Sequence, residues 1–458
     1  MYHKLRGILA CAVAIIMIFA FVACGSSTDT TNNSDSQNST VAGTSTQPKE
    51  IKSLTLMAPT QWLEWAGSKA VTDYFNNSKT QDYGAKLELV KVPEGDQGTQ
   101  VVKAKFAAGD VPDLLFWFDT SSTLDASLLF AEQDPEADWT KNFGGITGDL
   151  NQIKYMKDGK LYGVPFGEST TTCVFYNKKV FADAGVQVPK TWEEFLQVCD
   201  AIKAKGVTPV YYSGKDAWTL QLIPILGWGY GALEPDAATL INSIETNKKK
   251  IESLGFLVDS IAKTKELLDK GYVQKTWLSD TYVQAQQALT EGKAGMYPMG
   301  TWVIPEFIKV SSQETVNGEL GAFAMPLGAK PGIVFTGPSA IFVSKNGQNV
   351  ELAKEVATYF GTVEAQNQWF NVQPGIPFIK GITANLQGPF KDLNDIFNSE
   401  EKLGDFMLSA KKGYGWSNGL DKDIQDLLVG VKTPLQVAQT LDVEWAKQAK
   451  SKNDPDFK

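Results

Sequence analysis

The alternation of apolar and polar residues predicts a regular order of strands and helices in the part of the chain that follows residue 50. The predicted elements are strands at 52–58, 86–92 and 113–118 and helices at about 64–76 and 99–108. The last of these strands is almost entirely apolar, as is typical of a buried parallel strand. The order predicts an open parallel sheet with helices on both faces. Ligands bind at the carboxyl ends of such strands, which here are the loops 59–63, 93–98 and 119–122.

A long extended segment from Leu161 to Tyr176 is interrupted by Pro165 and Gly167. Proline has no N–H for a strand ladder, and glycine frees the backbone. The interruption indicates a strand that leaves one sheet near Pro165 and enters another near Thr171, which would make it a hinge between two lobes. The alternative is one long bent strand at the edge of a single sheet, which the pattern taken alone slightly favours. A second extended segment, 335–343, is broken by a Gly-Pro pair and is predicted to partner the first.

Further elements are predicted downstream. They are helices at 177–185, 191–205, 248–270, 280–290 and 351–360, strands at 208–212 and 295–299, and a mostly helical tail from residue 400. Thr191 and Glu194 have the spacing of a capping box, and Gly206 is placed to end the helix that they begin.

The first 50 residues have the pattern of a targeting segment followed by a tether. Lys4 and Arg6 precede an uncharged apolar run that ends in Ala23-Cys24-Gly25. This pattern predicts a signal peptide at 1–23 and lipidation of Cys24, and the alternative is an uncleaved anchor helix. Residues 24–50 are too polar to form a core, so they are predicted to be a disordered tether. We expect the globular part on the outer face of a bacterial cytoplasmic membrane.

The composition removes several classes of function. The chain has a net charge of −9, and its one histidine and one arginine, His3 and Arg6, both lie in the predicted signal peptide. Histidine-dependent hydrolysis, histidine–zinc sites and arginine clamps for anions are therefore excluded for the mature chain. We expect no metal and no cofactor, and an acidic protein is a poor partner for nucleic acid. Cys173 and Cys199 could form a disulfide or remain two separate buried thiols.

The order of several short motifs resembles a known family. The motifs are AAGDVPDLLFW at 107–117, GKLYGVP at 159–165, YNKKVFADAG at 176–185, KTWEEF at 190–195, LTEGKAGM at 289–296, MGTW at 299–302 and LAKE at 352–355. Together, behind the Ala-Cys-Gly end of the signal, they resemble the bacterial extracellular solute-binding proteins of family 1, the maltose-binding-protein-like receptors of ABC importers. The motifs are spread over nearly all of the mature chain.

The resemblance implies an α/β fold of the periplasmic-binding-protein type II, with two lobes that close on a ligand about crossing hinge strands. The implied boundaries are residues 51–165 and about 338–385 for lobe 1, and about 167–336 and 386–458 for lobe 2. The implied ligand is a neutral mono- or oligosaccharide, the implied partner is an ABC transporter permease, and the implied state is a monomer. No enzymatic activity is implied.

The chemistry of sugars and the resemblance together suggest a set of ligand contacts. A sugar has apolar C–H faces that stack on aromatic rings, and hydroxyls that need donors and acceptors. The candidates are Trp62, Trp117, Trp218, Trp302 and Trp416 for stacking, Gln61, Gln97, Asp119 and Glu168 for hydroxyls, and Gly337 for close approach of the backbone. Trp302 has the Met-Gly-Thr-Trp context that matches the stacking position of the family.

Each candidate also has a structural explanation. Packing alone accounts for many tryptophans, and Trp117 could belong to the core of the sheet. Asp119 could cap a helix, and Glu168 could be a solvated hinge residue. Two other functions stay open: a glycoside hydrolase that uses Asp119 and Glu168 as a carboxylate pair, and a polyamine-binding relative that uses aromatic rings and carboxylates.

Overall fold

The computed structural model of the chain describes residues 49–118, 124, 126–143, 156–157, 160–382, 384–397, 399, 402–403, 412, 414 and 419–458. The strands within these ranges are β1 (Lys52–Pro59), β2 (Ala85–Val92), β3 (Leu114–Trp117), β4 (Met156–Lys157), β5 (Lys160–Leu161), β6 (Gly163–Asn177), β7 (Thr208–Val210), β8 (Ala294–Gly300), β9 (Leu320–Phe323), β10 (Ile333–Val343) and β11 (Lys402–Leu403). The predicted signal peptide, Cys24 and nearly all of the predicted tether lie outside the described residues.

The α-helices within the described residues lie between and after these strands. They are α1 (Thr60–Glu64), α2 (Ala66–Tyr74), α3 (Thr80–Tyr83), α4 (Gly95–Ala107), α5 (Ala126–Leu129), α6 (Asp138–Lys141), α7 (Lys178–Ala184), α8 (Trp192–Ala204), α9 (Leu222–Gly229), α10 (Ala237–Glu245), α11 (Gly255–Asp269), α12 (Tyr282–Thr290), α13 (Ile304–Val310), α14 (Gln313–Glu319), α15 (Val350–Phe360), α16 (Val363–Phe370), α17 (Pro389–Phe397), α18 (Leu420–Leu428) and α19 (Pro434–Ser451). There is one π-helix, η1 (Phe75–Lys79), among the described residues. The 3-10 helices are η3 (Ala217–Gln221), η4 (Tyr230–Leu233), η5 (Ile251–Ser253), η6 (Thr301–Val303) and η8 (Pro455–Phe457). Within the described part of the chain, no helix has both the length and the apolar character that a bilayer span requires.

One mixed sheet organises the described residues. Its strand order is β2-β1-β3-β10-β6-β8-β7, with β11 paired to β10 and β9 paired to β6. β1 is parallel to both β2 and β3, which confirms the parallel arrangement predicted for the first three strands. β7 and β8 are also parallel. β10 runs antiparallel to β3 and to β6, so the sheet as a whole is not purely parallel.

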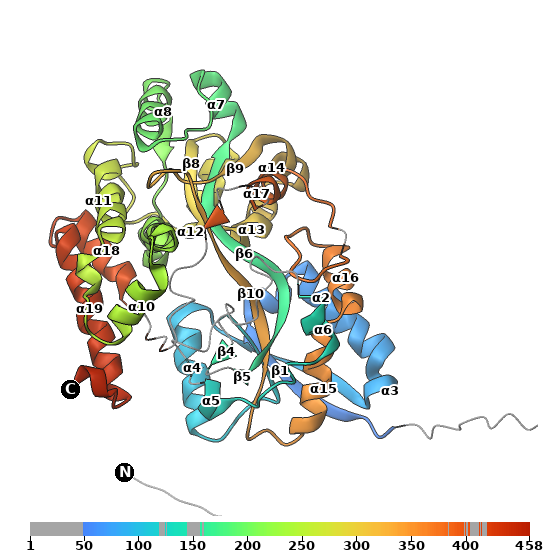
Figure 1. The fold of residues 1–458 in the computed structure, drawn as a ribbon. Helices are drawn as coiled ribbons and strands as arrows, with labels where there is room; N and C mark the ends of the chain where they lie inside the picture. Colours follow the sequence, from blue (N-terminus) through green and yellow to red (C-terminus); the bar gives the residue numbers. More distant parts are fainter. Residues whose placement is uncertain are drawn as a thin grey trace, which may run out of the picture. The chain divides into compact units, whose positions relative to one another are not determined.

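Strands β6 and β10 run side by side through the whole sheet, as Figure 1 shows. The first half of β6 pairs with the second half of β10, next to β3. The second half of β6 pairs with β8 and β9. Between these halves the register of β10 against β6 shifts on both sides of Gly337, and Gly167 has a φ of 96° that favours glycine. The two interruptions predicted from sequence therefore lie beside each other in adjacent strands.

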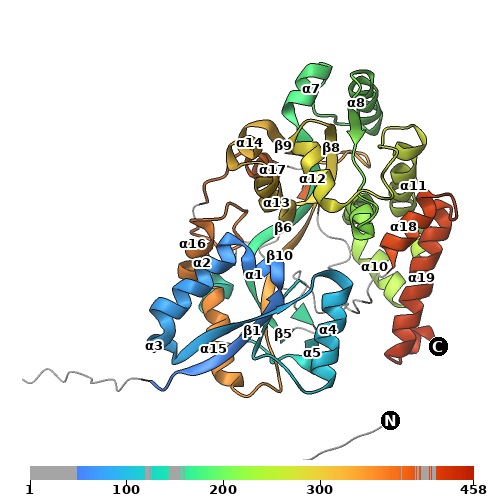
Figure 2. The ribbon, with the colours of Figure 1, turned by 180° about the vertical axis from the view of Figure 1, so that it is seen from behind.

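Buried side chains form separate cores on the two sides of this shift. The first core takes residues from Leu54 to Phe166 and again from Ala340 to Ile379. The second core consists of two adjoining clusters that take residues from Cys173 to Val334 and then from Ile376 onward. Within the first core, α2 and α16 lie side by side although they are far apart in sequence (Figure 2). The chain thus enters each core, leaves it and returns.

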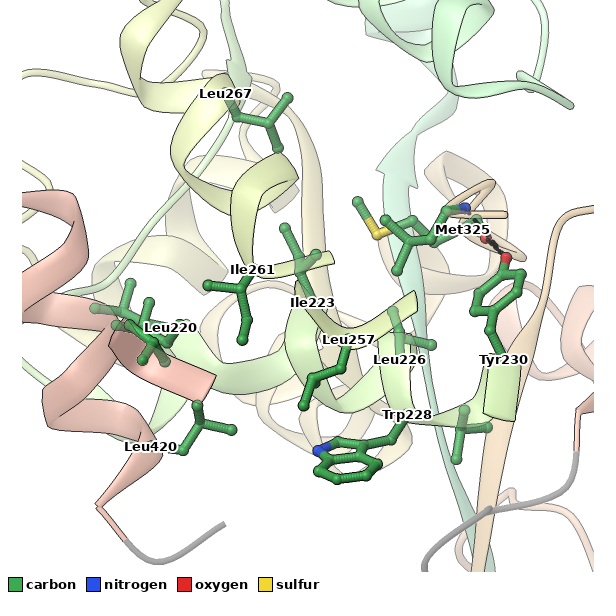
Figure 3. Close-up of a cluster of buried hydrophobic side chains, with 14 of the residues drawn as sticks. Leu220, Ile223, Leu226, Trp228, Tyr230, Leu257, Ile261, Leu267, Met325 and Leu420 are labelled. Atoms are coloured by element: carbon green, nitrogen blue, oxygen red, sulfur yellow. Dashed lines mark hydrogen bonds between the residues drawn. The ribbon is translucent and has the colours of Figure 1, made fainter. Parts of the chain in front are cut away.

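Figure 3 shows part of the second core, where α9, α11 and α18 pack together. Trp228 on α9 and Leu257 on α11 are buried, and Leu420 at the start of α18 is fully buried. The Tyr230 hydroxyl donates to the Met325 carbonyl over 2.8 Å, which ties the end of α9 to the segment between β9 and β10. The C-terminal helices are therefore part of the same core as the middle of the chain.

The single helix predicted over 64–76 is wrong at its start. α1 ends at Glu64, Trp65 is extended with a ψ of 140°, and α2 begins at Ala66. The break brings Gly67 under the ring of Trp369, where any Cβ would overlap the indole. The Gly67 N–H donates to the Gln373 side chain over 3.0 Å. A contact with a residue so distant in sequence leaves no mark in the local pattern.

Other local predictions are confirmed or settled. The Thr191 side chain and Glu194 form the predicted capping box at the start of α8. Cys173 and Cys199 are both buried free thiols, so the alternative of two separate thiols holds and the disulfide does not. Burial raises the pKa of the Cys173 thiol well above its ordinary value, which keeps it protonated and unreactive.

Candidate ligand-binding site

The loops that follow β1 and β2 begin side by side at one edge of the sheet. The last residues of the two strands are paired, and the Thr60 hydroxyl donates to the Val92 carbonyl over 3.2 Å. Gln61 and Trp62 belong to α1, and Gln97 belongs to α4, so all three come from helix starts at this edge. Gln61 and Trp62 are half-buried and Gln97 is exposed. The edge predicted to bind ligand therefore carries one aromatic ring and two amides.

Trp62 is the outer member of an aromatic cluster on the first core. Its ring centroid lies 5.4 Å from that of Trp65, in a stacked arrangement, and 5.0 Å from that of Phe116. Trp117 lies 6.3 Å away and is 0% exposed. No ligand atom can reach Trp117 in this conformation, so it has the core position that was its alternative. Trp62, by contrast, is only half-buried and packs against the rings of Trp65 and Phe116.

Trp302 lies at the corresponding edge of the second core. It belongs to η6, directly after β8, and its half-buried ring folds back over the end of that strand. A Cβ added to Gly300 would overlap this ring. Gly300 is therefore required for the Trp302 indole to lie across the end of β8. Trp302 is only partly buried and packs against the second core.

Trp218 on η3 and Tyr282 at the start of α12 form an aromatic corner. Their ring centroids lie 5.0 Å apart in an edge-to-face arrangement, and Trp218 is 36% exposed. The Tyr282 backbone N–H donates to the Asp216 carboxylate over 2.7 Å, which fixes the start of α12 against the turn that carries Trp218. An exposed indole held by an edge contact offers one free face.

A group of charges connects the edge of the first core to that of the second. Glu94 precedes α4, and Glu306 lies in the first turn of α13, where it pairs with Lys309 at 2.8 Å. Although Glu94 is exposed as a residue, protein atoms around its carboxyl group partly desolvate it, and together with the negative charge of Glu306 they raise its pKa from the ordinary 4.5 to about 7, while Lys309 acts in the opposite direction. Glu94 also contributes to the raised pKa of Tyr282, after burial, Tyr297 and Glu306. Glu94 therefore lies near α12 and α13.

The region between the two cores contains Glu168 and Gly337. Glu168 is only 7% exposed, so it is not the solvated hinge residue that the sequence allowed as an alternative. Its carboxyl is also closed to ligand in this conformation. Gly337 pairs with Thr170 at the register shift of β10. Asp119 and Trp416 lie outside the described residues, so both stay predictions.

Comparison with known proteins decides the family. A family model described as "Bacterial extracellular solute-binding protein" matches residues 69–398, well over half of the chain. The chain belongs to this family. The resemblance drawn from the short motifs is therefore confirmed, and so is the expectation of a binding protein rather than an enzyme.

Relatives of this solute-binding protein carry sugar-related names. The "Multiple sugar-binding protein" of Streptococcus mutans is 28% identical over 361 residues, which cover 72% of this chain and 80% of the relative. The "Diacetylchitobiose binding protein" of Streptomyces coelicolor is 25% identical over 50% of this chain and 52% of its own length. These names describe what those proteins bind.

Solved structures support the fold. A chitin oligosaccharide binding protein matches with a TM-score of 0.71 at 23% identity and covers 88% of this chain and 100% of its own. A complex of the binding protein RafE with raffinose matches with a TM-score of 0.68 at 22% identity, over 87% of this chain and 100% of its own. The predicted two-lobe α/β fold of a solute-binding protein is confirmed.

Sequence reasoning missed three residues that the structure brings to this site, Glu94, Tyr282 and Glu306. Glu94 lies in the loop 93–98 that was predicted to face ligand, so the position was available but the side chain was not selected. Glu306 follows Trp302 by one helical turn, and this spacing was the one local signal for it. Tyr282 is at the start of a helix with no sequence feature that points to a ligand.

Proposed function

We propose that this solute-binding protein captures a neutral mono- or oligosaccharide between its lobes and delivers it to the permease of an ABC importer. The observation that carries the proposal is the position of three tryptophans that are not fully buried. Trp62 and Trp302 directly follow the ends of β1 and β8, and Trp218 lies on η3, after β7. Rings at strand ends on two facing lobes suit the stacking faces of sugar rings. The sugar-related names of the relatives point to the same class of ligand.

The charges near these rings support a neutral ligand. Glu94 and Glu306 both add negative charge, and Lys309 is already paired with Glu306. Carboxylates accept hydrogen bonds from sugar hydroxyls, whereas a phosphate or uronate would be repelled. Gln61 and Gln97 supply amides that can donate or accept. We include Gly337 as a point of close backbone approach.

We further propose lobe boundaries and a closing movement. Lobe 1 comprises residues 51–165 and about 338–385, and lobe 2 comprises about 167–336 and 386–458. The division of buried residues between the two cores supports these boundaries. The interruptions at 164–168 and 335–338 are where the lobes turn relative to each other on ligand binding, as in hinge closure of other binding proteins.

Lipid attachment at Cys24 and action as a monomer complete the proposal. The charged start, the apolar run and the Ala-Cys-Gly end of the signal support lipidation. We expect Cys24→Ser to release the protein from the membrane fraction, or to leave it as uncleaved precursor. Fractionation of expressing cells checks this, with the unchanged chain as control, and normal cleavage with unchanged anchoring would contradict it.

A thermal-shift screen of the mature chain tests the ligand class. A ligand that binds only the folded state raises its apparent stability, by about 2.7 kcal/mol at a concentration of one hundred times Kd. We expect stabilisation by at least one neutral mono- or oligosaccharide, and none by sugar phosphates or uronates. Stabilisation by polyamines alone would favour the polyamine-binding alternative.

The glycoside hydrolase alternative is tested in the same samples. A hydrolase needs two carboxyl groups at a defined separation across the scissile bond, and the candidate pair was Asp119 and Glu168. The burial of Glu168 speaks against such a role. We expect chromatography to recover the stabilising sugar intact after prolonged incubation, and the appearance of cleavage products would reinstate the hydrolase.

A further inference from the structure

Glu168 lies where three segments of the chain cross between the two cores. Two of them are β6 and β10, whose register shifts beside Glu168. The third is the segment after α16, because α16 belongs to the first core, whereas Ile376 is buried with Phe390 in the second. Phe378 is buried in the first core again, so this segment touches the second core and returns within a few residues. The third crossing therefore passes beside the hinge strand.

One hydrogen bond joins this third crossing to β6, since the Ser169 N–H donates to the Ile376 carbonyl over 2.8 Å. The Ile376 N–H also lies near enough to the Glu168 carboxyl to lower its pKa, against the larger effect of burial. Gly375 has no side chain, and a Cβ there would overlap Oε2 of Glu168. The residues 375–376 are therefore shaped around the carboxyl group.

The surroundings of the carboxyl group are apolar. The ring of Trp369 lies next to Gly167, 3.2 Å from the position that a Cβ would take on this glycine. Burial raises the pKa of Glu168 well above its ordinary value. The Ile376 N–H is the one group that acts against burial, and no charged side chain among the described residues contributes. Within the same residues Oε2 has no hydrogen-bond partner. A buried carboxylate without a partner for one oxygen is strongly disfavoured, so the group is held as the neutral acid.

We propose that Glu168 is a positioning residue that, as a neutral carboxylic acid, clips residues 375–376 to β6 and holds the lobes in the present arrangement. When the crossings separate, water reaches the carboxyl group and it loses its proton. Because the pKa of Glu168 is raised in the clipped arrangement, low pH favours that arrangement, and the preference is lost as pH rises through the raised value. A role for this contact in lobe movement rests on the proposed function. The contact itself and the protonation of Glu168 can be measured without ligand.

The test uses the mature chain without ligand. Difference infrared spectra of wild type against Glu168→Gln are expected to contain the carbonyl band of a protonated carboxylic acid at pH 7. Glu136→Gln, which changes an exposed glutamate, is the matched control and should remove no such band. A wild-type spectrum without the band means that Glu168 is ionised, and this overturns the proposal.

Amide hydrogen exchange at Ser169 and Ile376 reports on the clip itself. Rates are compared with those of β1 amides in the same sample, because exchange chemistry itself accelerates with pH. We expect Glu168→Ala to exchange at least tenfold faster than wild type at both amides, and Glu168→Gln, which keeps an acceptor for Ile376, to retain protection. Wild type should lose protection toward high pH, and Glu168→Gln should not. Unchanged protection in Glu168→Ala overturns the proposal. The exchange experiment uses no ligand, so its result and the result of the ligand screen can be told apart.

Discussion

Trp302→Ala is expected to weaken sugar binding by about 1–3 kcal/mol, which is roughly one to two powers of ten in Kd. The substitution removes the indole face at the end of β8 and leaves the hydroxyl partners in place. Because the ring is only half-buried, the unliganded protein should lose less stability than it would from loss of a core tryptophan such as Trp445. Calorimetric titration with the sugar found in the screen, beside a melting curve of the unliganded variant, measures both effects.

Two further variants sharpen this experiment. Trp192→Ala is the matched control, since Trp192 lies on α8, away from the strand ends, and donates to Glu266 over 2.9 Å. It should leave affinity unchanged. Gly300→Ala keeps the indole but forces it out of position, because a Cβ would overlap the ring. It should weaken binding in the same direction as Trp302→Ala. If Trp302→Ala keeps full affinity while its melting temperature collapses, Trp302 is a packing residue and its assignment to the site is wrong.

Local patterns were sufficient for those elements whose shape depends on their own residues. The capping box of Thr191 and Glu194 needs only neighbours three positions apart. The strand alternation of β1 and the apolar run of β3 reflect which faces they bury. By contrast β9, a four-residue strand, was not predicted, because its run of Leu320 to Phe323 is too short to be distinguished from a helix segment. The break at Trp65 depends on Trp369 and was equally out of reach.

The residues of the candidate site also fall into those that local sequence could predict and those that it could not. Trp62, Trp218 and Trp302 could be selected because each follows a predicted strand and would otherwise be an exposed apolar ring. Trp117 follows the same rule but is fully buried, since the end of β3 is covered by other aromatic rings. The position of Glu94 next to Glu306 arises only when two cores built from distant segments come together. No spacing in the chain encodes that contact.

Glu94 is expected to make sugar affinity depend on pH. In this arrangement burial and Glu306 raise its pKa from 4.5 to about 7, with Lys309 and Tyr282 as the other titratable groups that face it. An open arrangement that separates Glu94 from Glu306 returns the pKa toward 4.5. Below pH 4.5, Glu94 is protonated in both arrangements and does not oppose lobe closure. Between pH 4.5 and about 7 the negative charge of Glu94 opposes closure increasingly, and above about pH 7 this opposition stays constant. Affinity should therefore be higher at low pH.

The expected change in Kd for a neutral sugar between pH 5 and pH 8 is about tenfold, less than the full shift implies, because Glu94 is exposed as a residue and water screens part of the repulsion. Glu94→Gln should bind with the same affinity at both pH values, whereas Glu88→Gln, on an exposed position of β2, should behave as wild type. Titration calorimetry in two buffers of different ionisation enthalpy should also detect proton uptake on binding near pH 7 in wild type, and none in Glu94→Gln. Two results would contradict this prediction: a wild-type affinity that does not change from pH 5 to pH 8, or a pH dependence that persists in Glu94→Gln. Either result would show that lobe closure does not bring Glu94 against Glu306.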